Sequence, residues 1–437
     1  MSAYSVAALI GVACAAGIVA EASAQAQSAP LTRADAIARA LGDDPRLGAA
    51  DAARRAAEAR VRQAGRLPNP ALDIVVENVE GSGPYQAWER GEATYSLTQR
   101  LELGGDRSAR RRLAERDLDA ARLGADIERL DLIEEVEASY IDAQAAEAAR
   151  LVAEERLVVA QELADAARRR VAAARDPLMA GSRAQARLAE AQIDADAARL
   201  AALAARARLA SYWGGGDDFS IDIASFERIG GATPRLDEGA GLRGRLADAA
   251  TLHQGPSPDL ALADLDRARA DAGVAVERAR SIPDPDVQFG WRSFNESDET
   301  AFVFGLSVPL QLWDRNTDGV AQARAESARA GFEASARARA IARERAMLAV
   351  QVETARAEVE ALDASVLPNV EAALQSAREG YAMGAFAYLD VLEAQRALTD
   401  ARMRRISALR SYHRADAALA RIAGARAARA PSEESSR

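Results

Sequence analysis

The chain contains one pattern twice, and this internal duplication constrains its fold more than any other feature. Three landmarks recur in the same order, each displaced by about 210 residues. They are a Pro-X-Pro turn at 68–70 and 283–285, an apolar segment at 95–103 and 304–312, and a final apolar segment at 209–214 and 419–424. Because a fixed period indicates one structural unit used repeatedly, we expect two similar halves that pack together.

Each repeat has the pattern of a helix, two strands, a very long helix, a break and another helix. The expected short helices are 46–66 and 258–281, and the expected long helices are 106–174 and 318–383, the second with a kink near Pro368. At 1.5 Å per residue, nearly 70 residues span about 100 Å. A compact domain does not need such a rod, whereas a tube across the periplasm does. An ordinary secreted coiled coil is the alternative.

The strand candidates are 72–79, 93–103, 287–294 and 301–312. In the last of them bulky apolar side chains alternate with smaller ones, which gives one apolar face. This pattern fits lipid on one side and a lumen on the other, although a half-buried strand in a soluble domain would show it too. After the N-terminal segment no run approaches the roughly 18 apolar residues of a spanning helix. A membrane crossing would therefore require a barrel.

Four strands are too few to close a barrel around a lumen. An open sheet in lipid would leave backbone groups unpaired, at several kcal/mol each. Several chains must therefore share one barrel, and three copies would supply twelve strands. The expected fold is mainly α-helical, with duplicated helical hairpins that form a tunnel and four strands per chain in a trimeric barrel.

The ends and the middle of the chain differ in composition from the repeats. Residues 1–26 resemble a secretory signal peptide without a basic start, and a short membrane anchor is the alternative. Cys14, the only cysteine, lies in this segment with Gly11 three positions before it, which disfavours lipid attachment. We expect a first repeat at 27–213, a glycine-rich linker at 214–257, a second repeat at 258–424 and a disordered tail at 425–437.

The composition argues against several functions. The formal charge of −10 disfavours nucleic acid as a partner. The chain has two histidines, His253 and His413, and no cluster of soft ligands, so no resident metal and no cofactor is expected. No pairing of a nucleophile with a base is evident either. We therefore expect no enzyme activity.

The doubled architecture resembles the outer membrane efflux protein family, the TolC-like channels. The residues that carry the resemblance are the turns Asn69-Pro70 and Asp284-Pro285 and the segment 380–395, which begins Gly380-Tyr381-Ala382-Met383-Gly384. The segment 99–107 is similar to the cobalt–zinc–cadmium resistance branch, whose members usually have lysine where Asp106 stands. The resemblance implies a homotrimer with a twelve-stranded barrel in the outer membrane lipid and a helical tunnel in the periplasm. It also implies two partners, a periplasmic adaptor and a proton-driven pump of the inner membrane.

The same resemblance implies a periplasmic gate. Asp390 and Glu393 share one helix face, where a solvated acidic surface is the alternative; by resemblance they line the closed mouth. By resemblance Tyr381 is the gate tyrosine, with a packed interfacial aromatic as the alternative. Phe386 stands where some relatives have a gating arginine, and Ala180 has no side-chain acceptor. A different contact is therefore expected, such as Arg183 with a neighbour's Glu393.

The leading hypothesis is a passive exit duct for divalent heavy-metal cations. Its pore and gate residues are Tyr381, Asp390 and Glu393, and no metal-binding residue is expected. One alternative is a drug or polypeptide channel of the same fold. The other is a secreted coiled-coil scaffold without a pore.

Overall fold

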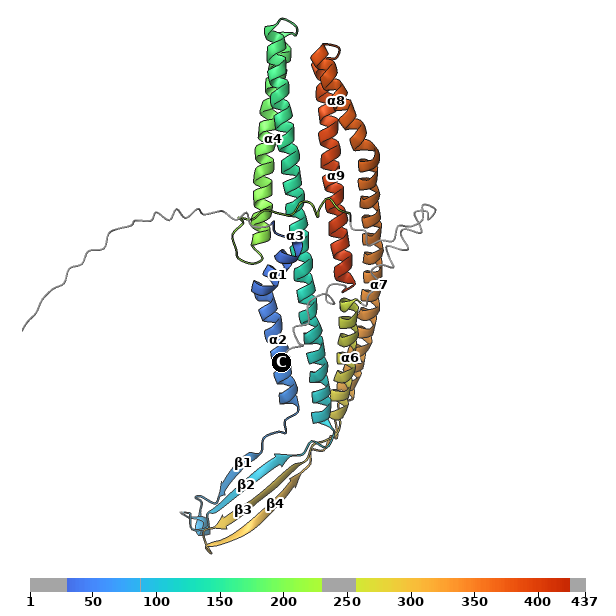
Figure 1. The fold of residues 1–437 in the computed structure, drawn as a ribbon. Coiled ribbons are helices and arrows are strands. Elements are labelled where there is room, and N and C mark those ends of the chain that lie inside the picture. The colour runs from blue at the N-terminus through green and yellow to red at the C-terminus, as the bar shows by residue number, and fades with distance from the viewer. Residues whose placement is uncertain (1–29, 87, 230–256, 425–437) are drawn as a thin grey trace, which may run out of the picture.

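The computed structural model describes residues 30–86, 88–229 and 257–424 (Figure 1). The expected signal peptide, Cys14, the tail and most of the expected linker lie outside these residues. The described chain forms an elongated molecule with helical hairpins at one end and a four-stranded sheet at the other (Figure 1).

Two long helical hairpins lie side by side. The first consists of α3 (Asp106–Ala172) and α4 (Leu178–Ala210). The second consists of α7 (Thr317–Ala361), the π-helical turn η2 (Leu362–Val366), α8 (Leu367–Met383) and α9 (Tyr388–Ile422). The predicted kink near Pro368 thus takes the form of a π-helical turn just before the proline. In the residues described, no helix has both the length and the apolar composition needed to cross a bilayer.

Shorter helices connect the sheet to the hairpins. They are α1 (Arg33–Asp43), α2 (Pro45–Ala64) and α6 (Pro258–Ala279), with the 3₁₀ turn η1 (Gly83–Tyr85) in a strand connection. Thr32 and Asp35 form a capping box at the start of α1. Asp44 accepts the Arg46 backbone N–H at the start of α2, where Pro45 occupies the first turn.

The sheet is antiparallel throughout, in the order β1-β2-β3-β4. Its strands are β1 (Ala71–Glu77), β2 (Glu92–Arg100), β3 (Asp286–Phe294) and β4 (Glu299–Ser307). Because β2 pairs with β3, the two repeats join directly in the sheet.

Three strands end earlier than the sequence predicted. β1 ends at Glu77 rather than at 79, and the next residue, Asn78, has a φ of 58°, which does not continue a strand. β2 ends at Arg100 rather than at 103, because the backbone N–H of Leu101 turns to the carbonyl of Pro285 and that of Leu103 to Asp284 Oδ1 at 3.1 Å. β4 ends at Ser307 rather than at 312. Pro309 lacks an N–H for the ladder, so the pairing stops before it.

The hairpins have a largely alanine core at the middle of the molecule. There the fully buried Tyr140 donates its hydroxyl to the Leu31 carbonyl at 2.7 Å. Ile221 forms a bridge with Leu31, and Phe226 is fully buried. The described start of the expected linker therefore packs against the helices.

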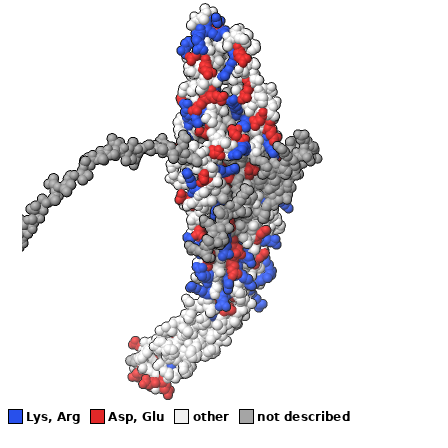
Figure 2. Space-filling model, in the orientation of Figure 1, with Lys and Arg blue, Asp and Glu red and all other residues white. Residues whose placement is uncertain are grey.

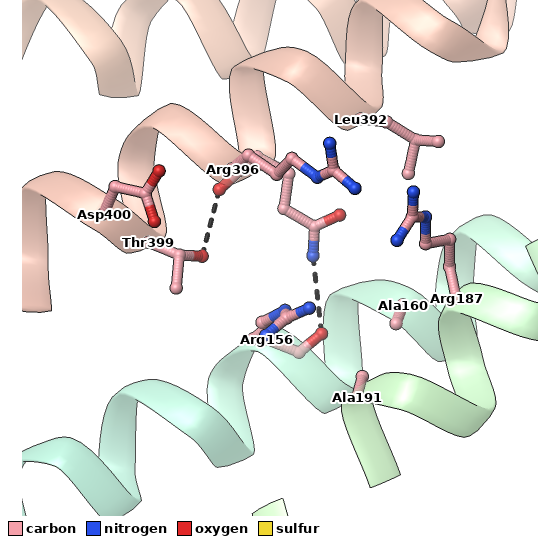
Figure 3. A pocket seen from close by; sticks show the side chains of 9 residues that line it. Arg156, Ala160, Arg187, Ala191, Leu392, Arg396, Thr399 and Asp400 are labelled. Atoms are coloured by element: carbon pink, nitrogen blue, oxygen red, sulfur yellow. Dashed lines mark hydrogen bonds between the residues drawn. The ribbon is translucent and has the colours of Figure 1, made fainter. Parts of the chain in front are cut away.

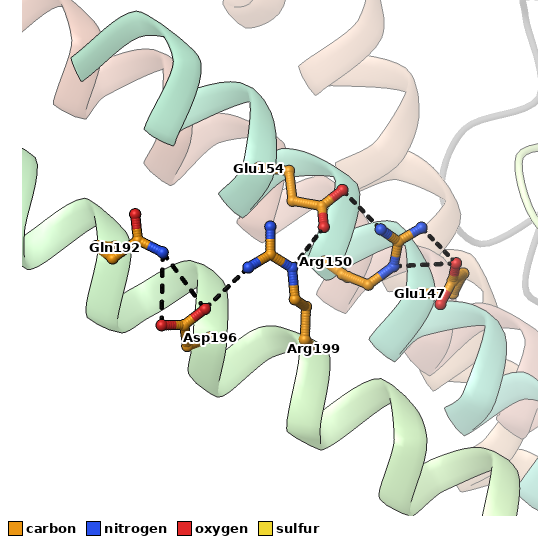
Figure 4. Close-up of polar contacts among 6 residues, drawn as sticks. All are labelled: Glu147, Arg150, Glu154, Gln192, Asp196 and Arg199. Atoms are coloured by element: carbon orange, nitrogen blue, oxygen red, sulfur yellow. Dashed lines mark hydrogen bonds and ion pairs between the residues drawn. The ribbon is translucent and has the colours of Figure 1, made fainter. Parts of the chain in front are cut away.

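Alternating charges hold the two helices of the first hairpin together along their surface. On α3, Arg150 pairs with Glu154. Glu154 also pairs with Arg199 of α4, which in turn pairs with Asp196 (Figure 4). Glu147 binds Arg150 at one end of this chain, and Gln192 contacts Asp196 at the other. The Arg199–Glu154 contact is the one in this group that crosses from α4 to α3, and each such surface pair stabilises the protein little.

Candidate functional site

The two faces of the sheet differ in chemistry. Cross-strand register places large apolar side chains in rows on one face, such as Leu72-Leu97-Phe289-Phe304 and Ile74-Tyr95-Trp291-Phe302. Much of this face is open in the single chain: Phe302 is 84% and Phe304 72% exposed. Figure 2 shows this end of the molecule almost free of charge, with acidic residues at its far tip. An apolar surface of this extent requires a cover of lipid or protein.

The opposite face of the sheet is polar. Thr98 donates to Asp73 at 2.6 Å, and Gln288 donates to Ser96 at 2.6 Å. Arg292 pairs with both Glu92 and Glu77. These hydrogen bonds run across the strands and satisfy groups that a lipid contact would leave without partners. The sheet is thus built to separate an apolar medium from an aqueous one.

The far tips of the two hairpins meet in a polar contact around Tyr381. This tyrosine of α8 donates its hydroxyl to Asp176 Oδ2 at 3.0 Å, in the loop between α3 and α4. Arg170 of α3 binds both oxygens of Asp176, at 2.9 and 3.0 Å, and donates to the Tyr381 carbonyl at 2.8 Å. Its guanidinium also lies 4.6 Å from the centre of the Tyr381 ring. One carboxylate therefore joins the first hairpin to the second.

The Asp176 carboxyl and the Tyr381 phenol each keep a fixed protonation state at neutral pH. The Arg170 guanidinium, partly opposed by burial, lowers the pKa of Asp176 below its usual 3.8. Burial, reinforced by the hydrogen bond to Asp176, raises the pKa of Tyr381 to about 12. The carboxylate therefore stays ionised and the phenol stays protonated, as the hydrogen bond requires.

The glycines and aromatic residues around this contact shape the end of α8 and the turn that follows it. Gly384 ends α8 with a φ of 82°, a conformation that glycine adopts without strain. A Cβ on Gly380 would meet the Phe386 ring at 2.1 Å, so the close packing of Phe386 against the helix requires glycine there. Tyr388 packs against Tyr381 with ring centres 5.8 Å apart.

The acidic residues predicted for the mouth lie beside the contact and are exposed. Asp390 accepts the backbone N–H of Ala387 at 2.8 Å and so caps the start of α9. Glu393 lies one turn further along the same helix. Arg183 is also exposed, and no contact joins it to Glu393 within the single chain described. Its suggested pairing with a neighbouring subunit stays a prediction.

Sequence reasoning missed Asp176 and Arg170. From the sequence it was clear only that Ala180 has no side-chain acceptor, whereas the structure supplies an acid four residues earlier, at Asp176. The available signal was the Asp176-Pro177 dipeptide, since an acid before a proline is common where one helix ends and another begins. The matching arginine precedes it by six residues on α3.

The sequence profile described as "Outer membrane efflux protein" matches residues 36–215 and 253–425. The chain belongs to this family. It is 30% identical over 413 residues to the cobalt-zinc-cadmium resistance protein CzcC of Cupriavidus metallidurans, which covers 90% of each chain. It is 34% identical to the nickel and cobalt resistance protein CnrC of the same species, over 63% of this chain and 64% of the relative.

Solved structures of efflux channels share the fold. The channel CusC superposes with a TM-score of 0.73 at 18% identity, over 90% of this chain and 91% of the other. VceC of Vibrio cholerae superposes with a TM-score of 0.70 at 21% identity, over 90% and 96%. The TolC-like fold that the resemblance implied is confirmed, and family membership places the chain in the outer membrane with its helices toward the periplasm.

The sequence departs from the cobalt–zinc–cadmium resistance branch at one residue where the sheet joins the helices. Asp106, in place of the lysine that the resemblance predicts, is the first residue of α3 and is buried. Its pKa is raised, mainly because the carboxyl is buried and secondly because the Asp284 carboxylate is nearby. Both repeats converge at this junction, because Asp284 and Pro285 accept backbone hydrogen bonds from Leu103 and Leu101.

Proposed function

We propose that the chain is the outer-membrane channel subunit of a tripartite efflux system for divalent heavy-metal cations of the cobalt, zinc and cadmium class. The observation that carries this proposal is the 30% identity to CzcC over 90% of both chains. The subunit acts as a passive duct and performs no catalytic step. A periplasmic adaptor and a proton-driven inner-membrane pump complete the system, and cargo selection belongs to the pump.

The working unit is a homotrimer. Helices α4 and α7 lie on opposite flanks of the molecule (Figure 1), and each carries exposed apolar residues. These are Ile193, Leu200 and Leu203 on α4, and Phe332, Met347 and Val350 on α7. If these two different flanks meet, each subunit contacts the next head-to-tail, and such contacts form a ring when the rotation between subunits closes.

The edges of the sheet support the same assembly. Strands β1 and β4 are its two edges, and each presents unpaired backbone groups. Three copies joined β4 to β1 give twelve strands in a closed barrel, which removes every edge. The face with Phe304 and Trp291 then contacts lipid, and the face with Arg292 lines the lumen.

At the periplasmic mouth, Asp390 and Glu393 of three subunits form a ring of six carboxylates. Changing Asp390→Asn together with Glu393→Gln should lower the preference for cations over anions by about tenfold at low salt. Asparagine keeps a side-chain oxygen that can cap α9, so the change removes charge without removing the cap. Reversal potentials in planar bilayers under a salt gradient measure the preference. An unchanged preference would remove these residues from the pore lining.

The cargo is tested by deleting the gene in its native host. The deletion should lower tolerance to cobalt, zinc and cadmium salts by about tenfold or more, since exit through the outer membrane is lost. Restoring the wild-type gene should restore tolerance. If tolerance to all three metals is unchanged while tolerance to drugs falls, the chain is a drug channel of the same fold instead.

A further inference from the structure

Three arginines from three helices line one cavity between the hairpins. Arg156 lies on α3, Arg187 on α4 and Arg396 on α9 (Figure 3). The cavity has a volume of about 270 Å³, and the small side chains of Ala160 and Ala191 leave it open. Figure 3 shows the guanidinium groups of Arg187 and Arg396 turned toward the same space. Both hairpins therefore contribute positive charge to one cavity, which is partly open to solvent on the side of the exposed Arg396.

The three arginines differ in how well they are neutralised. Arg156 pairs with Asp194 of α4. Among the described residues Arg187 pairs with the exposed Glu190 alone, three residues away on its own helix, and such pairs are weak. Arg396 forms no ion pair in the part of the chain that the structure describes. Asp400 lines the same cavity, but Figure 3 shows its carboxylate away from the Arg396 guanidinium.

We propose that this cavity binds a small oxyanion that bridges the two hairpins. Guanidinium groups bind carboxylate and phosphate oxygens through pairs of parallel hydrogen bonds, which are stronger than neutral ones. An oxyanion between Arg187 and Arg396 relieves the repulsion between their charges. The ligand is either phosphate or a small carboxylate, because both present two oxygens to a guanidinium group.

The bound anion stabilises the contact between the hairpins. Gln395, which is buried beside the cavity, already approaches the Arg156 carbonyl at 3.4 Å across the α9–α3 boundary. An oxyanion adds charged contacts at the same boundary and so favours the state in which the hairpins lie together. This role is separate from the transport of cations, since the ligand is an anion held outside the sheet and the tip contact.

The test uses the purified trimeric channel in detergent, with ionic strength held constant by sodium chloride. Thermal unfolding is followed while inorganic phosphate, or in a second arm acetate, replaces chloride. We expect a saturable rise in Tm. Arg396→Ala and Arg187→Gln should each weaken the apparent affinity by about tenfold. Arg404→Ala is the matched control, because this α9 arginine pairs with Glu358 outside the cavity.

Each outcome decides the proposal. Saturation by phosphate assigns phosphate as the class of oxyanion bound, and saturation by acetate alone assigns a carboxylate. The proposal is overturned if neither anion gives a saturable rise in Tm. It is also overturned if the Arg404 control loses as much affinity as the two cavity variants. If Arg396→Ala does not fold or assemble, the affinity of the Arg187→Gln variant decides the proposal.

Discussion

Replacing Phe304 with arginine is expected to reduce the amount of trimer in the outer membrane by at least about tenfold. Phe304 lies on the apolar face of β4, opposite Phe289, and is largely exposed in the single chain. A charged side chain facing lipid costs about 2–4 kcal/mol near the middle of the bilayer, and a trimer carries three copies. The measurement is the quantity of trimer in isolated outer membranes, resolved on gels without heating.

The matched control is Val303→Arg, one residue earlier on the same strand. It introduces the same side chain at the same depth, but on the face that carries Gln288 and Ser96. This variant should assemble nearly as well as the wild type, because its guanidinium points into water. If both variants assemble equally, the apolar face does not contact lipid and the barrel proposal fails.

The alternation around Phe304 also shows how far sequence reasoning could go. The faces of β4 were predictable because side chains on a strand alternate with a period of two. The first long helix was predictable because nothing interrupts its apolar period before Pro177. Both signals are local in sequence, and α3 begins at Asp106 as expected. The duplication then predicted the same order of helices and strands in the second repeat.

Features that depend on distant contacts escaped prediction. The π-helical turn at Leu362–Val366 comes just before Pro368, yet the proline alone indicates only a kink. Asp363 in this turn pairs with Arg405 of α9, and Arg405 also binds Glu227. The partner of Tyr381 is separated from it by 205 residues, so the Asp176-Pro177 dipeptide marks a turn but does not indicate which residue the acid contacts.

Replacing Asp176 with alanine is expected to raise the spontaneous open probability by about tenfold or more. The change removes the acceptor of the Tyr381 hydroxyl and the partner of Arg170 together. Hydrogen bonds to charged groups stabilise by about 1.5–3 kcal/mol each, and the loss occurs in all three subunits. Tyr381→Phe should have a smaller effect, because the Arg170–Asp176 pair remains. Single-channel recording in planar bilayers measures the open probability.

A control and a pH series make this prediction specific to the contact between the hairpins. Asp165→Ala removes a carboxylate on α3 itself, whose partner Arg168 is three residues away, and should leave gating unchanged. The pKa of Asp176 is lowered, so its contribution is complete above 3.8 and is lost only as pH falls through the lower value. Wild-type open probability should therefore not vary between about pH 5 and 7. If it rises in that range, or if both alanine variants open alike, Asp176 does not hold the tips closed.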